Sequence, residues 1–102
     1  MIIPQQKVYY VVFFETLYDS IEEAFSQAPD LINTHLARTN ELHNQGMLLM
    51  AGAFLNTPQD KLGTMAICAT HEAAEEYARG DPFVLNGMVS KWYIREWANS
   101  FI

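Results

Sequence analysis

Residues 7–15, KVYYVVFFE, decide how this chain folds. The stretch is rich in β-branched and aromatic residues, a composition that is typical of strands. Successive side chains of a strand point to opposite faces of its sheet. Here both faces are apolar, with Val8, Tyr10, Val12 and Phe14 on one and Tyr9, Val11 and Phe13 on the other. The pattern therefore predicts a strand that is covered on both sides.

The segments that follow this strand alternate between helical and strand patterns. A helix is predicted over residues 28–46 and a shorter one over residues 70–80. The remaining strands are predicted over residues 47–55, 61–69 and 88–98, the first two of these joined by the polar turn 56–60. The order is β-α-β-β-α-β, which is the split βαβ pattern of ferredoxin-like domains.

Capping residues mark the ends of both predicted helices. Asp30 or Asn33 is suited to the start of the first, and Gly46 to its end. Thr70 is suited to the start of the second helix, and Gly80 to its end.

The predicted fold class is α+β, with an antiparallel sheet that has helices on one face only. The other face of the sheet is then left apolar and uncovered, because residues 7–15 and 47–55 are apolar on both sides. The simplest cover is a second copy of the chain, so we expect a homodimer with sheets packed face to face. The alternative is a monomer that exposes an aromatic sheet.

Length and composition limit the classes of function. The 102 residues are enough for a single domain, 1–102, and half of them are apolar. The net charge of −6 argues against a nucleic-acid partner, and no apolar run is long enough to span a bilayer. The start of the chain does not resemble a signal peptide, so we expect a cytoplasmic protein. The single cysteine, Cys68, lies in an apolar stretch and is interpreted as a buried thiol.

Two histidines fall on the apolar side of the first predicted helix. At about 100° per residue, His35 and His43 lie within an arc of roughly 140° that also holds Leu31, Ile32, Leu36, Thr39 and Leu42. Eight residues separate the two histidines by about 12 Å along the axis, so they are not predicted to share a metal ion. His43, near the helix end, is interpreted as structural, and His71 as exposed and without a role.

Asp81 is the most unusual polar placement in the second half of the chain. It stands between Gly80 and Pro82, and a residue before proline favours an extended backbone that can direct its carboxylate. Read by itself, Asp81 either ends a helix or serves as a directed partner for a buried imidazole.

The stretches THLARTNELHNQGMLLMAGAF, residues 34–54, and DPFVLNGMVSKWYIREW, residues 81–97, resemble the YciI-like, or YCII-related, family of small ferredoxin-like proteins. Two departures are visible. Ala53 stands where the family pattern has a proline after Ala-Gly, and residues 17–30 match the pattern poorly.

The resemblance implies a dimeric α+β barrel with a His-Asp dyad in a pocket between sheet and helices. His35 and Asp81 occupy the positions of that dyad. Known chemistry in the family resembles the dehydrochlorination of a chlorinated hydroxyquinone, and related dimeric barrels include lactone isomerases.

The expected chemistry is proton abstraction by His35 as a general base, oriented by Asp81, on a small carbonyl or phenolic substrate. No metal or other cofactor is expected, and the reaction would be an elimination or an isomerisation, because neither Cys68 nor Ser90 has a base beside it. The candidate substrate contacts are Phe83, Trp92, Gly52 and Met50. For Phe83, Trp92 and Met50 the alternative interpretation is a place in the core. The alternative function is a binding module that holds a ligand or partner in the same dimeric barrel without chemistry.

Overall fold

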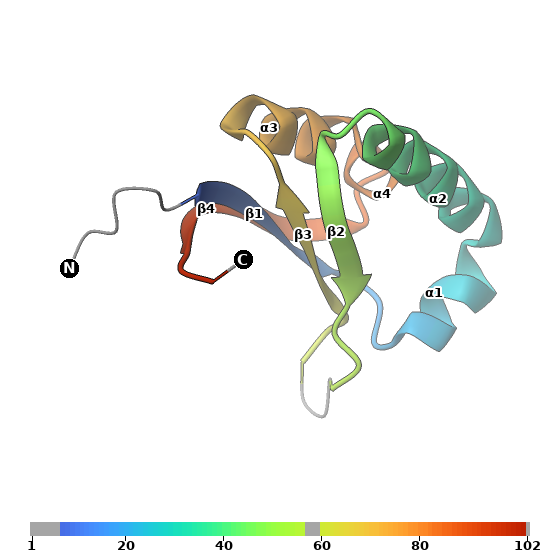
Figure 1. Ribbon diagram of the computed structural model, residues 1–102. Coiled ribbons are helices and arrows are strands. Elements are labelled where there is room, and N and C mark those ends of the chain that lie inside the picture. The colour runs from blue at the N-terminus through green and yellow to red at the C-terminus, as the bar shows by residue number, and fades with distance from the viewer. Residues whose placement is uncertain (1–6, 57–59, 102) are drawn as a thin grey trace.

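The computed structural model describes residues 7–56 and 60–101, and its centre is a four-stranded antiparallel sheet (Figure 1). The strands are β1, Lys7–Thr16; β2, Leu48–Ala53; β3, Gly63–Cys68; and β4, Val89–Asn99. Their order across the sheet is β2-β3-β1-β4, so the long apolar β1 is a central strand. The predicted fold class, mixed α+β with an antiparallel sheet, is confirmed. The predicted turn 56–60 lies partly outside the described residues.

Four helices pack on one side of this sheet, two more than the sequence pattern predicts (Figure 1). They are α1, Ile21–Gln27; α2, Pro29–Asn44; α3, His71–Gly80; and α4, Pro82–Leu85. The start of α1 carries a capping signal that the prediction missed: the Ser20 hydroxyl accepts a hydrogen bond from the Glu23 amide at 3.1 Å. The single turn of α4 is too short to show a hydrophobic period.

The predicted range and end of α2 agree with the structure, whereas the predicted N-cap is wrong. The helix begins at Pro29 after Ala28, with no side-chain cap, rather than at Asp30 or Asn33. Proline is favoured in the first turn because its φ is already helical and its missing amide hydrogen is not needed there. Gly46 follows the helix with φ +79°, a conformation that disfavours residues with a side chain.

The main core lies between β1 and α3. Val12 and Phe14 of β1 contact a helix face of small residues, on which Ala74 and Ala78 are fully buried. The Thr70 hydroxyl caps α3 by accepting from the Ala73 amide at 3.0 Å, as predicted. Cys68 is fully buried, as predicted, and burial raises the pKa of its thiol to about 11.

No helix of the described residues lies on the opposite face of the sheet, the open face, which is rich in aromatic side chains. Phe13 stacks on Tyr93 with ring centroids 5.1 Å apart, and Tyr9 lies 6.3 Å from Trp97. Tyr93 is 39% exposed and Trp97 is 46% exposed. The sequence predicts this consequence of the two-sided apolar character of β1: within residues 7–56 and 60–101, no helix covers the second face of the sheet. No helix among the described residues is long and apolar enough to cross a membrane.

Candidate functional site

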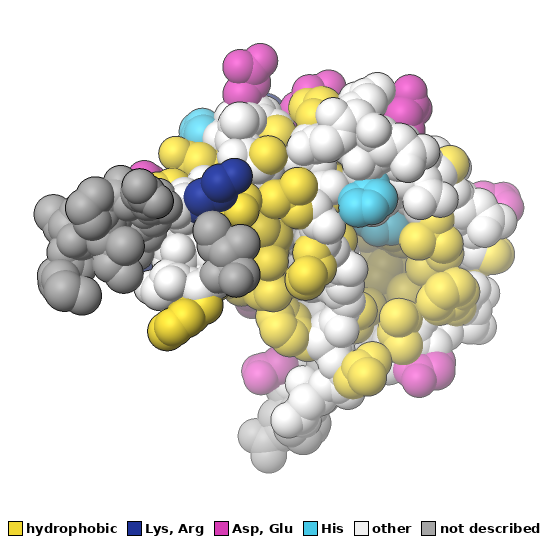
Figure 2. Space-filling model, viewed as in Figure 1, with side chains coloured by type: hydrophobic (Ala, Val, Ile, Leu, Met, Phe, Trp, Pro, Cys, Tyr) yellow, Lys and Arg dark blue, Asp and Glu magenta, His cyan; other side chains and the backbone are white. Residues whose placement is uncertain are grey.

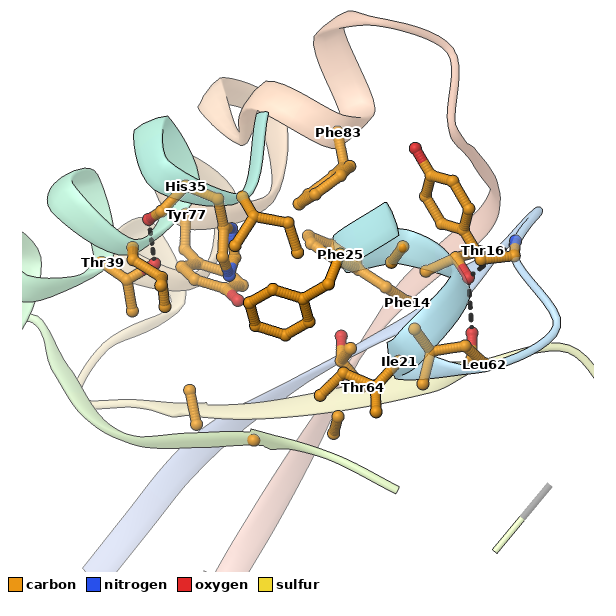
Figure 3. Close-up of a pocket in the computed structure, with 17 residues that line it drawn as sticks. Phe14, Thr16, Ile21, Phe25, His35, Thr39, Leu62, Thr64, Tyr77 and Phe83 are labelled. Atoms are coloured by element: carbon orange, nitrogen blue, oxygen red, sulfur yellow. Dashed lines mark hydrogen bonds between the residues drawn. The ribbon is translucent and has the colours of Figure 1, made fainter. Parts of the chain in front are cut away.

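A cavity of about 260 Å³ lies between the sheet and the helices (Figure 3). In the space-filling view it is a hollow lined mainly by hydrophobic side chains, on the side of β2 that faces α1 and α2 (Figure 2). Aromatic rings form much of its wall: Phe14, Tyr18, Phe25, Tyr77 and Phe83. No lysine, arginine, aspartate or glutamate is among its described lining residues. The cavity is therefore suited to a small, largely apolar and uncharged molecule.

The candidate dyad lies at the wall of this cavity. His35 is presented by α2, and Asp81 joins α3 to α4, 46 residues further along the chain. The Nδ1 atom of His35 lies 2.5 Å from Oδ1 of Asp81. The side chain of Asp81 is 1% exposed and that of His35 is 22% exposed. The two residues that the sequence pairs are thus in direct contact, while their catalytic role stays a prediction.

Asp81 holds its position through both carboxylate oxygens. Its Oδ2 accepts a hydrogen bond from the Phe83 amide at 3.0 Å, which makes Asp81 the N-cap of α4. Pro82 takes the first helical position of α4, where a proline is favoured. The sequence left two interpretations of Asp81 open, and both apply: it lies at a helix end, and its carboxylate is directed at the His35 imidazole.

This arrangement defines the state of the imidazole ring. A carboxylate only accepts hydrogen bonds, so Nδ1 of His35 must carry the hydrogen. In the neutral ring, Nε2 is then an unprotonated acceptor, and no described residue forms a hydrogen bond with it. A free basic nitrogen on a residue that lines the cavity is what proton abstraction requires.

Arg38 links α2, which carries His35, to the end of α3, which precedes Asp81. Its place on the polar side of the helical wheel does not predict this role. Its guanidinium donates to the carbonyl oxygens of Tyr77 at 3.1 Å and Glu76 at 2.6 Å, near the C-terminus of α3. The guanidinium lies against Gly80, where a Cβ atom would collide with it. Gly80 therefore leaves room for the Arg38 guanidinium at the end of α3.

The candidate substrate contacts divide into two groups. Phe83 and Gly52 line the cavity, and the Phe83 ring lies 5.5 Å from the His35 ring. Trp92 and Met50 do not line it. Trp92 belongs to β4, at the far edge of the sheet from α2, and its ring lies 5.2 Å beneath the Arg79 guanidinium. Met50 lies beside an irregularity in the pairing of β2 and is 65% exposed.

Sequence reasoning missed several residues that line the cavity. Phe25 of α1 and Leu36 of α2 are each 51% exposed and lie at its mouth. Tyr77 of α3 is 3% exposed and stacks on Phe14 with centroids 5.5 Å apart. The sequence placed Leu36 in the apolar arc of α2. It gave no indication of a role for Phe25, because residues 17–30 match the family pattern poorly.

The other histidines lie outside the cavity lining. His43 is exposed and its Nδ1 lies 2.8 Å from the carbonyl oxygen of Leu48, which joins the end of α2 to β2. His71 is exposed at the start of α3, as predicted. Within the described ranges, no group of three or more metal-ligating side chains is present.

Asp81→Ala is expected to lower the free energy of unfolding by about 2–4 kcal/mol, because it removes an N-cap and a hydrogen bond between ionisable groups. Asp81→Asn keeps an oxygen that can cap α4, so we expect a smaller loss, about 1–2 kcal/mol. Urea unfolding measures both losses. The exposed Asp60→Ala is the control and should stay within about 0.5 kcal/mol of the natural chain. Equal effects of Asp81→Ala and Asp60→Ala would contradict the structural role of Asp81.

Comparison with known proteins agrees with the fold and identifies the family. The chain belongs to the YCII-related family, since the model of the YCII-related domain matches residues 9–98. It is 31% identical over 87 residues to the protein YciI of Escherichia coli, covering 78% of this chain and 85% of that one. YciI of Shigella flexneri is similar to the same extent.

Solved structures share the architecture at lower identity. The 5-chloro-2-hydroxyhydroquinone dehydrochlorinase TftG of Burkholderia phenoliruptrix, in complex with 2,5-dihydroxybenzoquinone, has a TM-score of 0.63 and 16% identity. The match covers 87% of this chain and 92% of TftG. A protein from Shewanella oneidensis has a TM-score of 0.52 and 11% identity, covering 96% of this chain and 95% of that one. At these identities the likeness concerns the fold.

Proposed function

We propose that this chain is a small enzyme that abstracts a proton from a carbonyl or phenolic substrate, with His35 as general base and Asp81 as its orienting partner. The observation that supports this function is the 2.5 Å contact between His35 Nδ1 and Asp81 Oδ1 at the wall of an apolar cavity. Oriented bases of this kind accelerate proton transfer by about 10²–10⁴-fold.

The proposed reaction begins when a substrate enters between Phe25 and Leu36, at the mouth of the cavity. Nε2 of His35 takes a proton from a carbon beside the carbonyl, or from a hydroxyl group, and the bond's electron pair moves onto the substrate oxygen. Asp81 stabilises the resulting imidazolium through Nδ1. Loss of an anion from the neighbouring carbon completes an elimination, and return of the proton to a different carbon completes an isomerisation.

Covalent catalysis has less support in this chain. The Cys68 thiol is fully buried and its pKa is raised to about 11, so little thiolate forms near neutral pH. The Ser90 hydroxyl donates to the carbonyl oxygen of Glu15 at 3.0 Å and does not line the cavity. TftG, which has a similar fold, is a dehydrochlorinase, and loss of hydrogen chloride is an elimination like the one proposed here.

We also propose that two copies pack through their open faces. Tyr93 and Trp97 are exposed large hydrophobic residues on this face, next to Phe13 and Val11. The same face also carries Arg95. An exposed surface on which large hydrophobic side chains predominate favours association. The resulting homodimer would leave the cavity, on the helical side of the sheet, open to substrate.

Deuterium incorporation in D₂O tests the proposed enzymatic function. Two compounds serve as probes: acetophenone, a neutral aryl ketone with exchangeable carbon-bound hydrogens, and 5-chloro-2-hydroxyhydroquinone, for which chloride release is also measured. We expect exchange or chloride release above the buffer rate with at least one. A chain that binds both probes and accelerates neither reaction would instead be a binding module.

A further inference from the structure

Tyr77 places a second polar group in the cavity, beside the candidate dyad. The residue is 3% exposed, yet its hydroxyl forms no hydrogen bond with any described residue. Within the described part of the chain, every fully buried side-chain oxygen or nitrogen has a partner. The Tyr77 hydroxyl must therefore reach open space, and the open space that Tyr77 borders is the cavity.

The fold holds this hydroxyl on the same wall as His35. Tyr77 lies four residues before Asp81, about one helical turn away. Its ring stacks on the Phe14 ring at an interplanar angle of 15°. Figure 3 shows the Tyr77 hydroxyl projecting toward the cavity next to the His35 and Phe25 side chains. Burial and the nearby Asp81 carboxylate both raise the pKa of the Tyr77 phenol, so the group stays protonated and able to donate.

Other hydroxyl groups of the cavity are less suited to this task. Thr16 donates to the carbonyl oxygen of Leu62 at 2.9 Å, and Thr39 donates to that of His35 at 2.6 Å. Thr64 and Tyr18 also line the cavity, but neither belongs to α3, the helix that precedes Asp81. Tyr77 lies on α3, which precedes Asp81, and lines the cavity together with His35.

We propose that the Tyr77 hydroxyl binds the substrate oxygen and selects neutral ring compounds that carry a hydrogen-bond-accepting carbonyl. This inference rests on the proposed function. As His35 removes the proton, negative charge develops on that oxygen, and a donor already in place stabilises it more than it stabilises the ground state. The absence of cationic side chains among the described lining residues disfavours carboxylates and phosphates.

The test compares acetophenone with α-methylstyrene, which has the same shape but a CH₂ group in place of the carbonyl oxygen. NMR titration gives the dissociation constant of each compound for the natural chain, for Tyr77→Phe and for Tyr10→Phe. Tyr10 is the matched control, because it is a half-buried tyrosine that packs on the core outside the cavity lining. Tyr77→Phe keeps the ring that stacks on Phe14, so the variant should fold.

We expect Tyr77→Phe to weaken acetophenone binding by about 3- to 10-fold and to leave α-methylstyrene binding unchanged, with no effect of Tyr10→Phe. Deuterium incorporation into bound acetophenone should fall by roughly 10²-fold. Equal effects on both compounds, no effect of Tyr77→Phe, or no binding of acetophenone to the natural chain would overturn the inference. Oxygen-selective binding without any exchange would support the role of Tyr77 and count against His35 as a base, so the two proposals fail separately.

Discussion

His35→Gln is expected to lower the rate of proton abstraction by about 10²–10⁴-fold, because the substituted amide has no basic nitrogen to accept the proton. The same variant should fold normally, since a glutamine amide is able to donate to Asp81 as the imidazole does. The measurement is deuterium incorporation or chloride release with whichever probe the natural chain turns over, together with thermal unfolding.

His43→Gln is the matched control for this experiment. It makes the same substitution two turns along the same helix, at an exposed residue outside the cavity lining. We expect its turnover to match that of the natural chain. If His35→Gln retained full activity, or if both variants lost it equally, His35 would not be the base.

Phe13→Asp is expected to halve the particle mass measured by light scattering. Phe13 is half-buried on the open face, where it stacks on Tyr93. In the proposed dimer an aspartate there would be removed from water among the aromatic rings of the open face, at a cost of several kcal/mol. Leu85→Asp is the control, because Leu85 is a 70% exposed residue of α4 on the helical side of the sheet.

The proposed dimer is contradicted by either of two results. The natural chain would have the mass of a single copy at all concentrations, or Phe13→Asp would keep the mass of the natural chain. A loss of mass in both Phe13→Asp and Leu85→Asp would mean that the association is not specific to the open face.

The strands were predictable because their signal is local. Residues 7–15 carry a run of β-branched and aromatic residues, and residues 63–68 are largely apolar. Thr70 and Gly46 mark helix ends by cap chemistry that acts within a few residues. Two helices escaped the prediction for different reasons. The polar start of α1 was visible in Ser20 and Glu23 but was not interpreted, whereas α4 is one turn stabilised by a cap.

Of the candidate site, the sequence predicted only the pair His35 and Asp81, because each of the two residues has an unusual local sequence context. His35 stood out as a polar residue on an apolar helical face, and Asp81 as a carboxylate held before a proline. The contact of Arg38 with the end of α3 joins residues 39 positions apart, and neither Arg38 nor Gly80 predicts it from the sequence. Tyr77 looked like an ordinary core residue, because its sequence spacing does not show that its hydroxyl ends at a cavity.

The most direct test of the account is the tautomer of His35, measured by long-range ¹H–¹⁵N correlation NMR at a pH where the ring is neutral. We expect the hydrogen on Nδ1 and an unprotonated Nε2 in the natural chain, because the Asp81 carboxylate only accepts hydrogen bonds. In Asp81→Asn the amide can donate instead, and the hydrogen should move largely to Nε2. A natural chain with the hydrogen on Nε2, or a tautomer that does not respond to Asp81→Asn, would contradict the claim that Asp81 orients His35 as a base.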